Sequence, residues 1–297
     1  MKIYIDGSNL IHRSHWVSTT RNISPVQLCL SSIKKYVDRF DSNDIYIAWD
    51  GKRDRHSVNH RRELLRDKYK STRDKEKNTA AFKNIDHVEK MTAYLGIYNF
   101  YPKTLEADDI IAWLALDKFN KHDSVIISTD QDLLQLINKH NCVYNPIKDM
   151  IINHENFEDI VGIPLEKFVE YKSVIGDKSD NIDGLPGVGP KRAYKIVMDQ
   201  KIESQSKEHK EIIERNIKLI CLRYSLDLNS EEVEYYHNEF KKQHPVKIDF
   251  DGFERGVKYH NMQQILNKLP EWQSTFRKSV DMNKLVSSID LLNYLHK

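Results

Sequence analysis

Short runs of apolar residues alternate with longer amphipathic patterns along the first 155 residues of the chain. The apolar runs, which are typical of buried strands, lie at Lys2–Ile5, Ile45–Trp49, Ile97–Tyr101, Ser124–Ser128 and Cys142–Tyr144. Patterns with helical spacing lie between or beside them, at Val26–Phe40, Ala80–Tyr94, Ala107–Phe119 and Gln131–Ile137. This alternation predicts an α/β fold in which helices flank a mostly parallel central sheet.

The rest of the chain has a different pattern. Strand signals fade from about residue 156, and helical patterns follow at Glu208–Leu226 and, in a short amphipathic stretch, at Leu285–Leu295. We therefore predict an α/β domain over residues 1–155 and a mainly helical region over residues 156–297.

A charged segment interrupts the first alternation. Residues 52–77 hold eleven Lys and Arg against five Asp and Glu. Such a run is ordinarily a solvated helix or loop. This one directly follows a strand that ends in Asp50, and ligands of parallel sheets bind beyond the carboxyl ends of the strands. The position favours a lid or a guide for a polyanion.

Composition narrows the class of protein. The 297 residues carry a formal charge of +2 and 39% hydrophobic residues, which is enough for a folded core. No apolar run approaches the roughly 18 residues that a membrane-spanning helix needs. The start MKIYIDG predicts a strand rather than a signal peptide. Three scattered cysteines without a CxxC pair argue against a disulfide framework or zinc site, so we expect a protein of the reducing cytoplasm.

Acidic residues follow four consecutive predicted strands. They are Asp6, Asp50, the group Glu106, Asp108 and Asp109, and the pair Asp130 and Asp132. A single aspartate in such a place is ordinarily a helix cap or a turn residue. Because the carboxyl ends of parallel strands lie side by side, the whole set is expected to converge on one region. Asp177 and Asp180, in the helical region, are expected to close it from the other side.

Converging carboxylates repel one another unless a cation neutralises them. A ligand set of oxygen atoms, without cysteine or histidine, favours Mg²⁺ or Mn²⁺ over zinc. The set contains more acids than a single ion needs. The sequence therefore predicts two or more metal positions, the arrangement that nucleases use for attack at phosphorus.

A glycine-rich turn, GLPGVGPK, spans residues 184–191. Its lysine does not directly follow the second glycine, which disfavours a nucleotide-binding P-loop. We interpret it as a tight turn that opens a helix at Pro190 and offers backbone N–H groups to a phosphate. An ordinary turn between helices is the alternative, and the neighbouring Lys191 and Arg192 favour contact with DNA phosphates.

Together these motifs resemble the structure-specific 5′-nuclease family, which includes flap endonucleases, the 5′-nuclease domain of bacterial DNA polymerase I and free-standing phage 5′→3′ exonucleases. The motifs are DGSNLIHR (6–13), YKSTR (69–73), EADDIIA (106–112), STDQDLLQL (128–136) and GDKSDNIDGLPGVGPKRA (176–193). Their order matches the family, and the size of the chain is similar to that of the phage enzymes, some of which are called RNase H because they remove RNA primers.

The resemblance implies a PIN-like 5′-nuclease fold with a basic helical arch over residues 52–80 and a helix–three-turn–helix around the glycine turn, residues 183–193. It assigns Asp6, Asp50, Glu106, Asp108 and Asp109 to a first metal group, and Asp130, Asp132, Asp177 and Asp180 to a second. Which oxygen binds metal in STDQD stays open, because several relatives carry glycine or a neighbouring acid at Asp130. The implied cofactors are two Mg²⁺ ions, for which Mn²⁺ substitutes, and a K⁺ ion at the glycine turn.

The resemblance also implies roles at the DNA. Lys70 and Arg73 are expected on the arch, facing the scissile phosphate, and act in catalysis together with Asp108. Tyr69 is expected to stack on a base, and Arg13 to steer the DNA. The residues expected to hold the downstream duplex are Gly187, Gly189, Lys191 and Arg192.

The implied function is a magnesium-dependent hydrolase, a 5′→3′ exonuclease and flap endonuclease that leaves 5′-phosphates during DNA replication or repair. Its expected partners are DNA with a free 5′ end or flap and RNA–DNA hybrid, but no membrane. We expect a monomer in the cytoplasm, or in that of an infected host if the gene belongs to a phage. The C-terminal tail is expected either to bind a replication protein or to form a simple packing helix.

Two other functions stay open at the level of sequence. A nuclease of related fold that acts on RNA alone is disfavoured by the basic insertion and the glycine turn. A non-catalytic protein that binds branched DNA is disfavoured by the nine acids, because a binder gains nothing from negative charge where DNA must lie.

Overall fold

A twisted sheet forms the centre of the computed structural model, which describes residues 1–42, 44–50, 59–65, 68–71, 75–116, 122–243 and 247–277. Its six strands have the order β3-β2-β1-β4-β5-β6. They are β1 (Lys2–Asp6), β2 (Ile45–Ala48), β3 (Tyr98–Phe100), β4 (Ser124–Ile127), β5 (Asn141–Asn145) and β6 (Met150–Ile152). All neighbouring strands run parallel except β6, which pairs antiparallel with β5 at the edge. The predicted α/β fold is confirmed.

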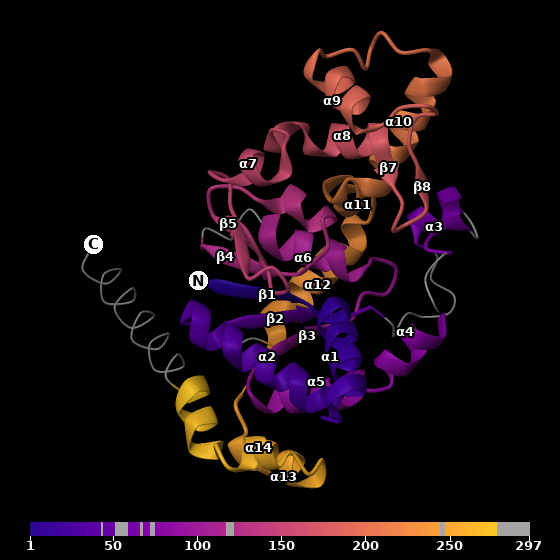
Figure 1. Cartoon of the computed structure of the whole chain (residues 1–297). Coiled ribbons are helices and arrows are strands. Elements are labelled where there is room, and N and C mark those ends of the chain that lie inside the picture. Colours follow the sequence, from indigo (N-terminus) through magenta and orange to yellow (C-terminus); the bar gives the residue numbers. More distant parts are fainter. Residues whose placement is uncertain are drawn as a thin grey trace.

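Helices cover both faces of the sheet, as Figure 1 shows. Successive residues of a strand point to opposite faces, so Ile3 and Ile5 of β1 pack in one core cluster and Tyr4 packs in the other. The first face carries α1 (Gly7–Arg21), α2 (Pro25–Phe40) and α5 (Ile85–Tyr94), and the second carries α6 (Ala107–Leu116) and the 3₁₀ helix η2 (Asp132–Leu136).

The helical region begins beyond β6. Its elements are α7 (Phe157–Val161), the 3₁₀ turn η3 (Leu165–Lys167), α8 (Phe168–Ile175), the two-stranded β7 (Gly176–Asp177) and β8 (Ile182–Asp183), α9 (Pro190–Met198), α10 (Lys207–Ile220), α11 (Leu222–Leu228), α12 (Ser230–Gln243), α13 (Phe250–Tyr259) and α14 (Gln263–Leu266). In Figure 1, α8, α9 and α10 lie at the end of the molecule away from α13 and α14.

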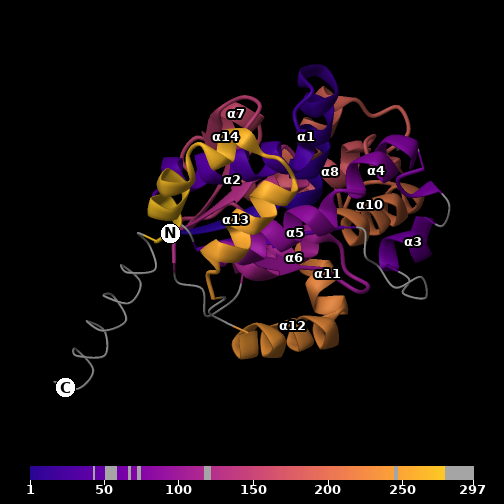
Figure 2. The ribbon, with the colours of Figure 1, turned by 90° about the horizontal axis from the view of Figure 1, so that it is seen from below.

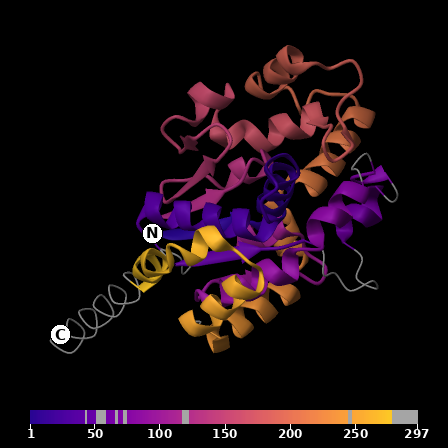
Figure 3. The ribbon, with the colours of Figure 1, turned by 60° about the horizontal axis from the view of Figure 1, so that its bottom comes forward.

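The last described helices return to the first face of the sheet. Phe253 of α13 and Phe276 are fully buried in the same cluster as residues of α2 and α5. Gln27 of α2 donates a hydrogen bond of 2.9 Å to Gln264 of α14. Figures 2 and 3 show these helices, in yellow, beside the N-terminal ones. The boundary at residue 155 stays a prediction, but part of the region beyond it completes the core of the first.

The structure divides two helices that the sequence patterns predicted as continuous. The pattern at Ala80–Tyr94 corresponds to α4 (Lys75–Phe82) and α5, with a turn between them. The pattern at Glu208–Leu226 is broken at Cys221, whose backbone is extended. The N–H of Leu222 donates a hydrogen bond of 2.9 Å to the side chain of Gln135, so a tertiary contact ends α10 there. The predicted helix at Leu285–Leu295 lies outside the described residues.

The basic segment is described in part. It contributes α3 (His60–Leu65), residues 68–71 and the start of α4, whereas residues 51–58, 66–67 and 72–74 lie outside the description. Among the helices that the structure describes, none is both long and apolar enough to cross a membrane. The three cysteines are free thiols, as expected.

Candidate active site at the carboxyl ends of the strands

Asp6 occupies the junction between β1 and α1. One carboxylate oxygen accepts a hydrogen bond of 2.8 Å from the N–H of Asn9 and so caps α1, and the other accepts one of 2.7 Å from the hydroxyl of Ser128, directly after β4. The side chain of Asn9 in turn donates to the hydroxyl of Thr129. Asp6 is therefore both a helix cap and a link between two neighbouring strand ends.

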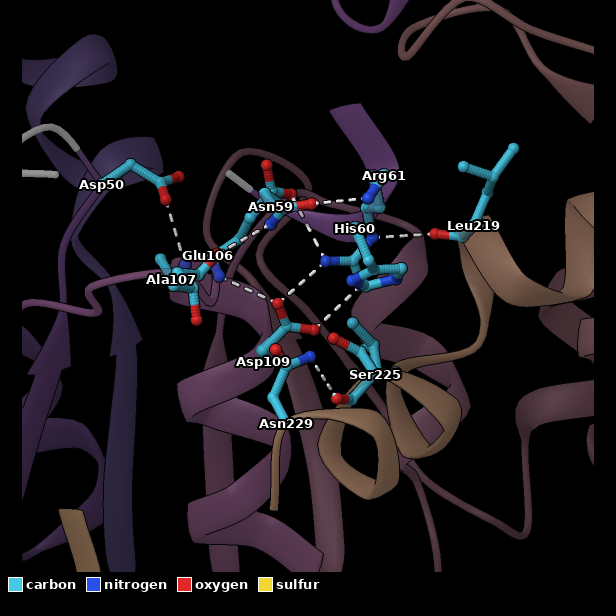
Figure 4. Close-up of polar contacts among 12 residues, drawn as sticks. Asp50, Asn59, His60, Arg61, Glu106, Ala107, Asp109, Leu219, Ser225 and Asn229 are labelled. Atoms are coloured by element: carbon cyan, nitrogen blue, oxygen red, sulfur yellow. Dashed lines mark hydrogen bonds and ion pairs between the residues drawn. The ribbon is translucent and has the colours of Figure 1, made fainter. Parts of the chain in front are cut away.

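Asp50 links β2 to the start of α6. Its Oδ1 accepts a hydrogen bond of 3.0 Å from the N–H of Ala107 (Figure 4), and the hydroxyl of Ser8 donates to its Oδ2 over 3.3 Å. The first turn of α6, which contains Asp108, is thereby held at the same edge of the sheet as Asp6.

Three carboxyl groups at this edge affect one another's ionisation. Burial, and after it the negative charges of Asp130 and Asp50, raise the pKa of Asp6 to about 6. Burial and the charges of Asp130 and Asp6 raise the pKa of Asp108 well above its ordinary value. Burial also raises the pKa of Asp130. Each carboxyl is thus held in a place where a nearby positive charge would be strongly favourable.

Lys172 of α8 lies between two further acids of the predicted set. Its ammonium group is 3.1 Å from Oδ1 of Asp132 and is hydrogen-bonded to Asp177. Burial raises the pKa of Asp132 to about 7, even though Lys172 acts to lower it. Burial would also raise the pKa of Asp177, but hydrogen bonds from Lys172 and Ser179 outweigh it and lower that pKa.

Lys70 lies between two more acids of the set. Its ammonium group donates a hydrogen bond of 2.8 Å to Oε2 of Glu106 and lies 3.6 Å from Oδ2 of Asp180. Its backbone N–H donates to the carbonyl of Asp180 over 3.1 Å, and Asn181 donates to the carbonyl of Lys68 over 3.0 Å. The basic segment is therefore fastened to the GDKSDN motif, and Lys70 takes up a left-handed backbone conformation there, with φ +52°.

Tyr69 is placed differently from the expectation. We expected its ring to stack on a base, but the side chain is buried, with 4% exposed. Its hydroxyl donates a hydrogen bond of 2.8 Å to Glu106 and lies 3.4 Å from Asp180. A ring enclosed in this way offers no face to a base in this structure, so stacking stays a prediction, and the hydroxyl contacts two acids of the set.

Asp109 also differs from the other predicted metal ligands. It is completely buried, and its two oxygens accept hydrogen bonds of 2.8 Å from the two terminal nitrogens of Arg61 (Figure 4). Its Oδ2 accepts a further one of 2.8 Å from the N–H of Glu106. Both oxygens of Asp109 thus accept hydrogen bonds, from the side chain of Arg61 and from the backbone before α6. That arrangement does not fit the expected role of metal ligand.

The residues expected to bind DNA lie in separate places. Gly187, with φ +69°, and Gly189 form the turn before α9, and a β-carbon at either position would meet no protein atom within 4 Å. Lys191 and Arg192 are exposed in the first turn of α9. Arg13 of α1 donates a hydrogen bond of 2.8 Å to the hydroxyl of Tyr36. Arg73 lies outside the described residues. Their roles at DNA stay predictions.

The donor set was compared with what a divalent cation requires. As the side chains stand, the described part of the chain contains no group of three or more acidic, histidine or cysteine residues closed around a metal position. Lys70 and Lys172 instead bridge acids of the set. Oδ1 of Asp132 is buried and receives no well-directed hydrogen bond from any described group. Oxygen donors with raised pKa values fit a hard cation, which would displace protons from the carboxyls and compete with the lysines.

Two residues of the site were not foreseen. Arg61 is one of many basic residues in its segment, and Lys172 is one of many lysines in the helical region. Their importance comes from tertiary neighbours, which no local pattern reveals.

Comparisons with known proteins show the family and the fold of the chain. Residues 2–162 match the family model of the 5′-3′ exonuclease N-terminal resolvase-like domain. A 5′-3′ exonuclease of Mycoplasmopsis pulmonis is 27% identical over 92% of this chain and 91% of its own. The flap endonuclease Xni of Shewanella woodyi is 27% identical over 77% of this chain and 95% of its own. A complex of the bacteriophage T5 D15 flap endonuclease with DNA and metal ions shares the fold, with a TM-score of 0.66 and 19% identity, over 81% of this chain and 97% of its own.

Proposed function

Because the chain belongs to the 5′-3′ exonuclease family, as the match of residues 2–162 shows, we propose that it is a divalent-metal-dependent structure-specific nuclease. It hydrolyses phosphodiester bonds at free 5′ ends and at 5′ flaps of DNA, and in RNA paired with DNA, and leaves 5′-phosphates during replication or repair. The observation that carries the proposal is the gathering of Asp6, Asp108 and Asp130 at the carboxyl ends of the strands, where burial and then the charge of Asp130 raise the pKa values of Asp6 and Asp108.

The proposed cofactor is Mg²⁺, at two positions, with Mn²⁺ as a substitute. Asp6, Asp50, Glu106 and Asp108 would hold the first position, and Asp130, Asp132, Asp177 and Asp180 the second. Asp109 is left out of the first group because Arg61 engages both of its oxygens. When bound, such ions supply an acidified water and charge stabilisation at the leaving oxygen. A K⁺ ion at the glycine turn completes the proposed set.

Lys70 supplies the positive charge of the chain itself at this edge. Its ammonium group already lies beside Glu106 and Asp180, so a short movement of the flexible side chain brings it to a phosphate placed among the acids. There it would offset charge that develops in the transition state. Tyr69, the backbone carbonyl of Asp180 and the side-chain amide of Asn181 hold the segment that carries Lys70 in place.

The glycine turn supplies the grip on duplex DNA in this proposal. The open space around Gly187 and Gly189 allows a phosphate to approach the backbone N–H groups at the start of α9. Lys191 and Arg192, in the first turn of that helix, add positive charge without reading the base sequence.

The decisive experiment is a cleavage map of 5′-labelled flap and RNA-primed substrates in Mg²⁺, in Mn²⁺ and in EDTA. We expect cleavage near the 5′ junction in either metal, 5′-phosphate ends, and loss of cleavage in EDTA and in Asp108→Asn. Full cleavage in EDTA, or unchanged cleavage by Asp108→Asn, would sink the metal mechanism.

The same assay separates the alternatives. Tight binding of flap DNA without turnover in either metal would favour a non-catalytic binder of branched DNA, and cleavage of single-stranded RNA alone would favour a ribonuclease. A monomeric state, a place in the cytoplasm and contact with a replication protein through the tail remain proposals that accompany the main one.

A further inference from the structure

We propose that Arg61 is a positioning residue that joins the base of the basic segment, the start of α6 and the α10–α11 junction, and so holds Glu106 and Lys70 in register. The inference deepens the nuclease function proposed above and rests on it. Arg61 itself is 3% exposed and lies in α3, so it contacts neither DNA nor solvent to any extent.

The first link runs from Arg61 to α6. Its two terminal nitrogens each donate a hydrogen bond of 2.8 Å to a different oxygen of Asp109, which is the planar, two-pronged geometry that arginine makes best. Asp109 in turn accepts the N–H of Glu106, and Nη1 of Arg61 lies 3.8 Å from Oε2 of that glutamate. The backbone and the carboxylate of Glu106 are therefore both oriented from the arginine.

The second link runs to the helical region. Nε of Arg61 donates a hydrogen bond of 2.8 Å to the carbonyl of Leu219, at the end of α10 (Figure 4). The neighbouring His60 lies 3.1 Å, through Nε2, from the carbonyl of Lys218. These carbonyls belong to the last turn of α10, where no helical N–H follows to bind them. Side chains of α3 thus cap the helix that packs against α8.

The third link holds the beginning of α3. The N–H of Arg61 donates a hydrogen bond of 2.8 Å to the side chain of Asn59 (Figure 4). The amide of Asn59 donates one of 3.1 Å to the carbonyl of Thr104. Thr104 lies two residues before Glu106 on the same loop. The start of the described part of the basic segment is therefore fastened to the loop that carries an acid of the site.

The contacts make Arg61 a junction rather than an ordinary surface ion pair. The side chains of Arg61 and Asp109 are 4% and 0% exposed, so each depends on the other for compensation of its charge. Burial opposes the positive charge, yet Asp109 and Glu106 raise the pKa of Arg61, so the guanidinium stays charged. A fixed, fully engaged cation can define the distance between three elements in a way that a mobile lysine cannot.

The test compares Arg61→Met, Arg61→Lys and Asp109→Asn with the control Asn141→Ala. Asn141 is a buried side chain between β4, β5 and the end of α6; it donates a hydrogen bond of 2.8 Å to the carbonyl of Ala115 and accepts one of 2.6 Å from Ser124. Its loss destabilises the fold without touching the site. The measurements are Mn²⁺ affinity of the DNA-free protein by paramagnetic resonance, and kcat and KM on a 5′ flap, all below the melting temperature of each variant.

We expect Arg61→Met and Asp109→Asn to weaken Mn²⁺ binding and lower kcat by about 10- to 100-fold, the range typical of residues that orient metal ligands. KM for the flap should change less than threefold, as the DNA contacts lie elsewhere. Arg61→Lys should recover part of the loss. Adding Asp109→Asn to Arg61→Met should cost little more than the single change, because the two side chains act as one unit.

Two results would overturn the inference. One is Mn²⁺ affinity and kcat in folded Arg61→Met that equal those of Asn141→Ala. The other, decisive if Arg61→Met does not fold, is full wild-type affinity and kcat in Arg61→Lys and Asp109→Asn. Absence of cleavage by the unsubstituted protein would instead refute the proposed nuclease function, and the Mn²⁺ measurements would still decide whether Arg61 positions the acids.

Discussion

The ammonium group of Lys172 in α8 lies 3.1 Å from Oδ1 of Asp132, which begins η2 after strand β4 of the central sheet. The same group is hydrogen-bonded to Asp177, so one buried cation neutralises two acids that would otherwise repel each other. Through its ion pair with Asp132, Lys172 links α8 to the edge of the sheet, and it does so with acids that are proposed to bind metal. Stability and metal binding should be coupled at this point.

Replacement of Lys172 tests that coupling. In EDTA, Lys172→Met should lower the free energy of unfolding by about 3–5 kcal/mol, because two buried carboxylates lose their compensating charge. Added Mg²⁺ should raise the melting temperature of the variant more than that of the wild type. Thermal melts with and without Mg²⁺ measure both effects. Lys167→Met, which removes a partly exposed ion pair with Glu170 on the same segment, is the control. An equal gain from Mg²⁺ in all three proteins would contradict the coupling.

The raised pKa of Asp132 predicts a pH dependence of stability without metal. Its pKa is 3.8 in the unfolded chain and about 7 in the folded one, so the folded state binds the proton more tightly. The stabilisation is complete below pH 3.8 and is lost as the pH rises through about 7. The pKa of Asp177 is lowered from 3.8, so its effect on the free energy of unfolding changes only at more acidic pH.

Melting temperatures in EDTA should therefore fall between about pH 5 and pH 7 more steeply in the wild type than in Asp132→Asn, which cannot titrate there. The difference between the two proteins cancels the contribution of histidines. Mg²⁺ competes with the proton, so the stabilisation by Mg²⁺ should grow over the same interval. Parallel curves for the two proteins would show that Asp132 does not carry the effect.

Lys70 is predicted to act on the cleavage rate as well as on stability, since its ammonium group also neutralises Glu106 and Asp180. Lys70→Met should lower single-turnover cleavage of a 5′ flap by about 10²–10³-fold, the typical cost of one charge-stabilising donor. Affinity for the flap in EDTA should change little, since a single charge is removed from a larger contact surface. Lys68→Met, two residues away with an exposed side chain, is the matched control. Equal rates for the two variants would exclude a special role for Lys70.

The glycine turn allows DNA binding to be separated from backbone strain. Gly187→Ala forces a β-carbon into a left-handed conformation and should cost about 1–2 kcal/mol of stability. Gly162→Ala, at φ +83° after α7 and also in open space, should cost the same without weakening DNA binding. Gly189→Ala carries no such strain, with φ −89°, and should keep full stability while its affinity for duplex DNA falls. Fluorescence anisotropy at fixed salt measures the affinity, and unchanged affinity in Gly189→Ala would contradict phosphate contact at this turn.

The sequence was most informative where chemistry follows from strand order. A parallel sheet places successive strand ends side by side, so Asp6, Asp50 and Asp108 could be expected together without knowledge of any contact. The exact roles of neighbours could not be foreseen. The acids of EADD look alike in sequence. In the structure, Asp109 accepts hydrogen bonds from Arg61, whereas the pKa of Asp108 is raised by burial and by the charges of Asp130 and Asp6.

Other differences have the same origin in tertiary contacts. The helix signal at Glu208–Leu226 is continuous, and only Gln135, from another part of the chain, explains the break at Cys221. Tyr69 lies in a charged segment that predicts solvent exposure, yet two acids bind its hydroxyl in the interior. Helix propensity and charge are properties of a local stretch of sequence. The end of α10 and the burial of Tyr69 depend instead on residues that are distant along the chain.

The return of α13 to the first face of the sheet sets a condition on biosynthesis. Phe253 and Phe276 pack against helices that are synthesised much earlier. The hydrogen bond from Gln27 to Gln264 joins residues that are 237 positions apart in the chain. The sheet cannot be sealed on that side until almost all of the described chain has been translated. Contacts so distant along the chain form slowly. The nascent protein should therefore expose apolar surface on this face of the sheet until α13 and α14 have been synthesised.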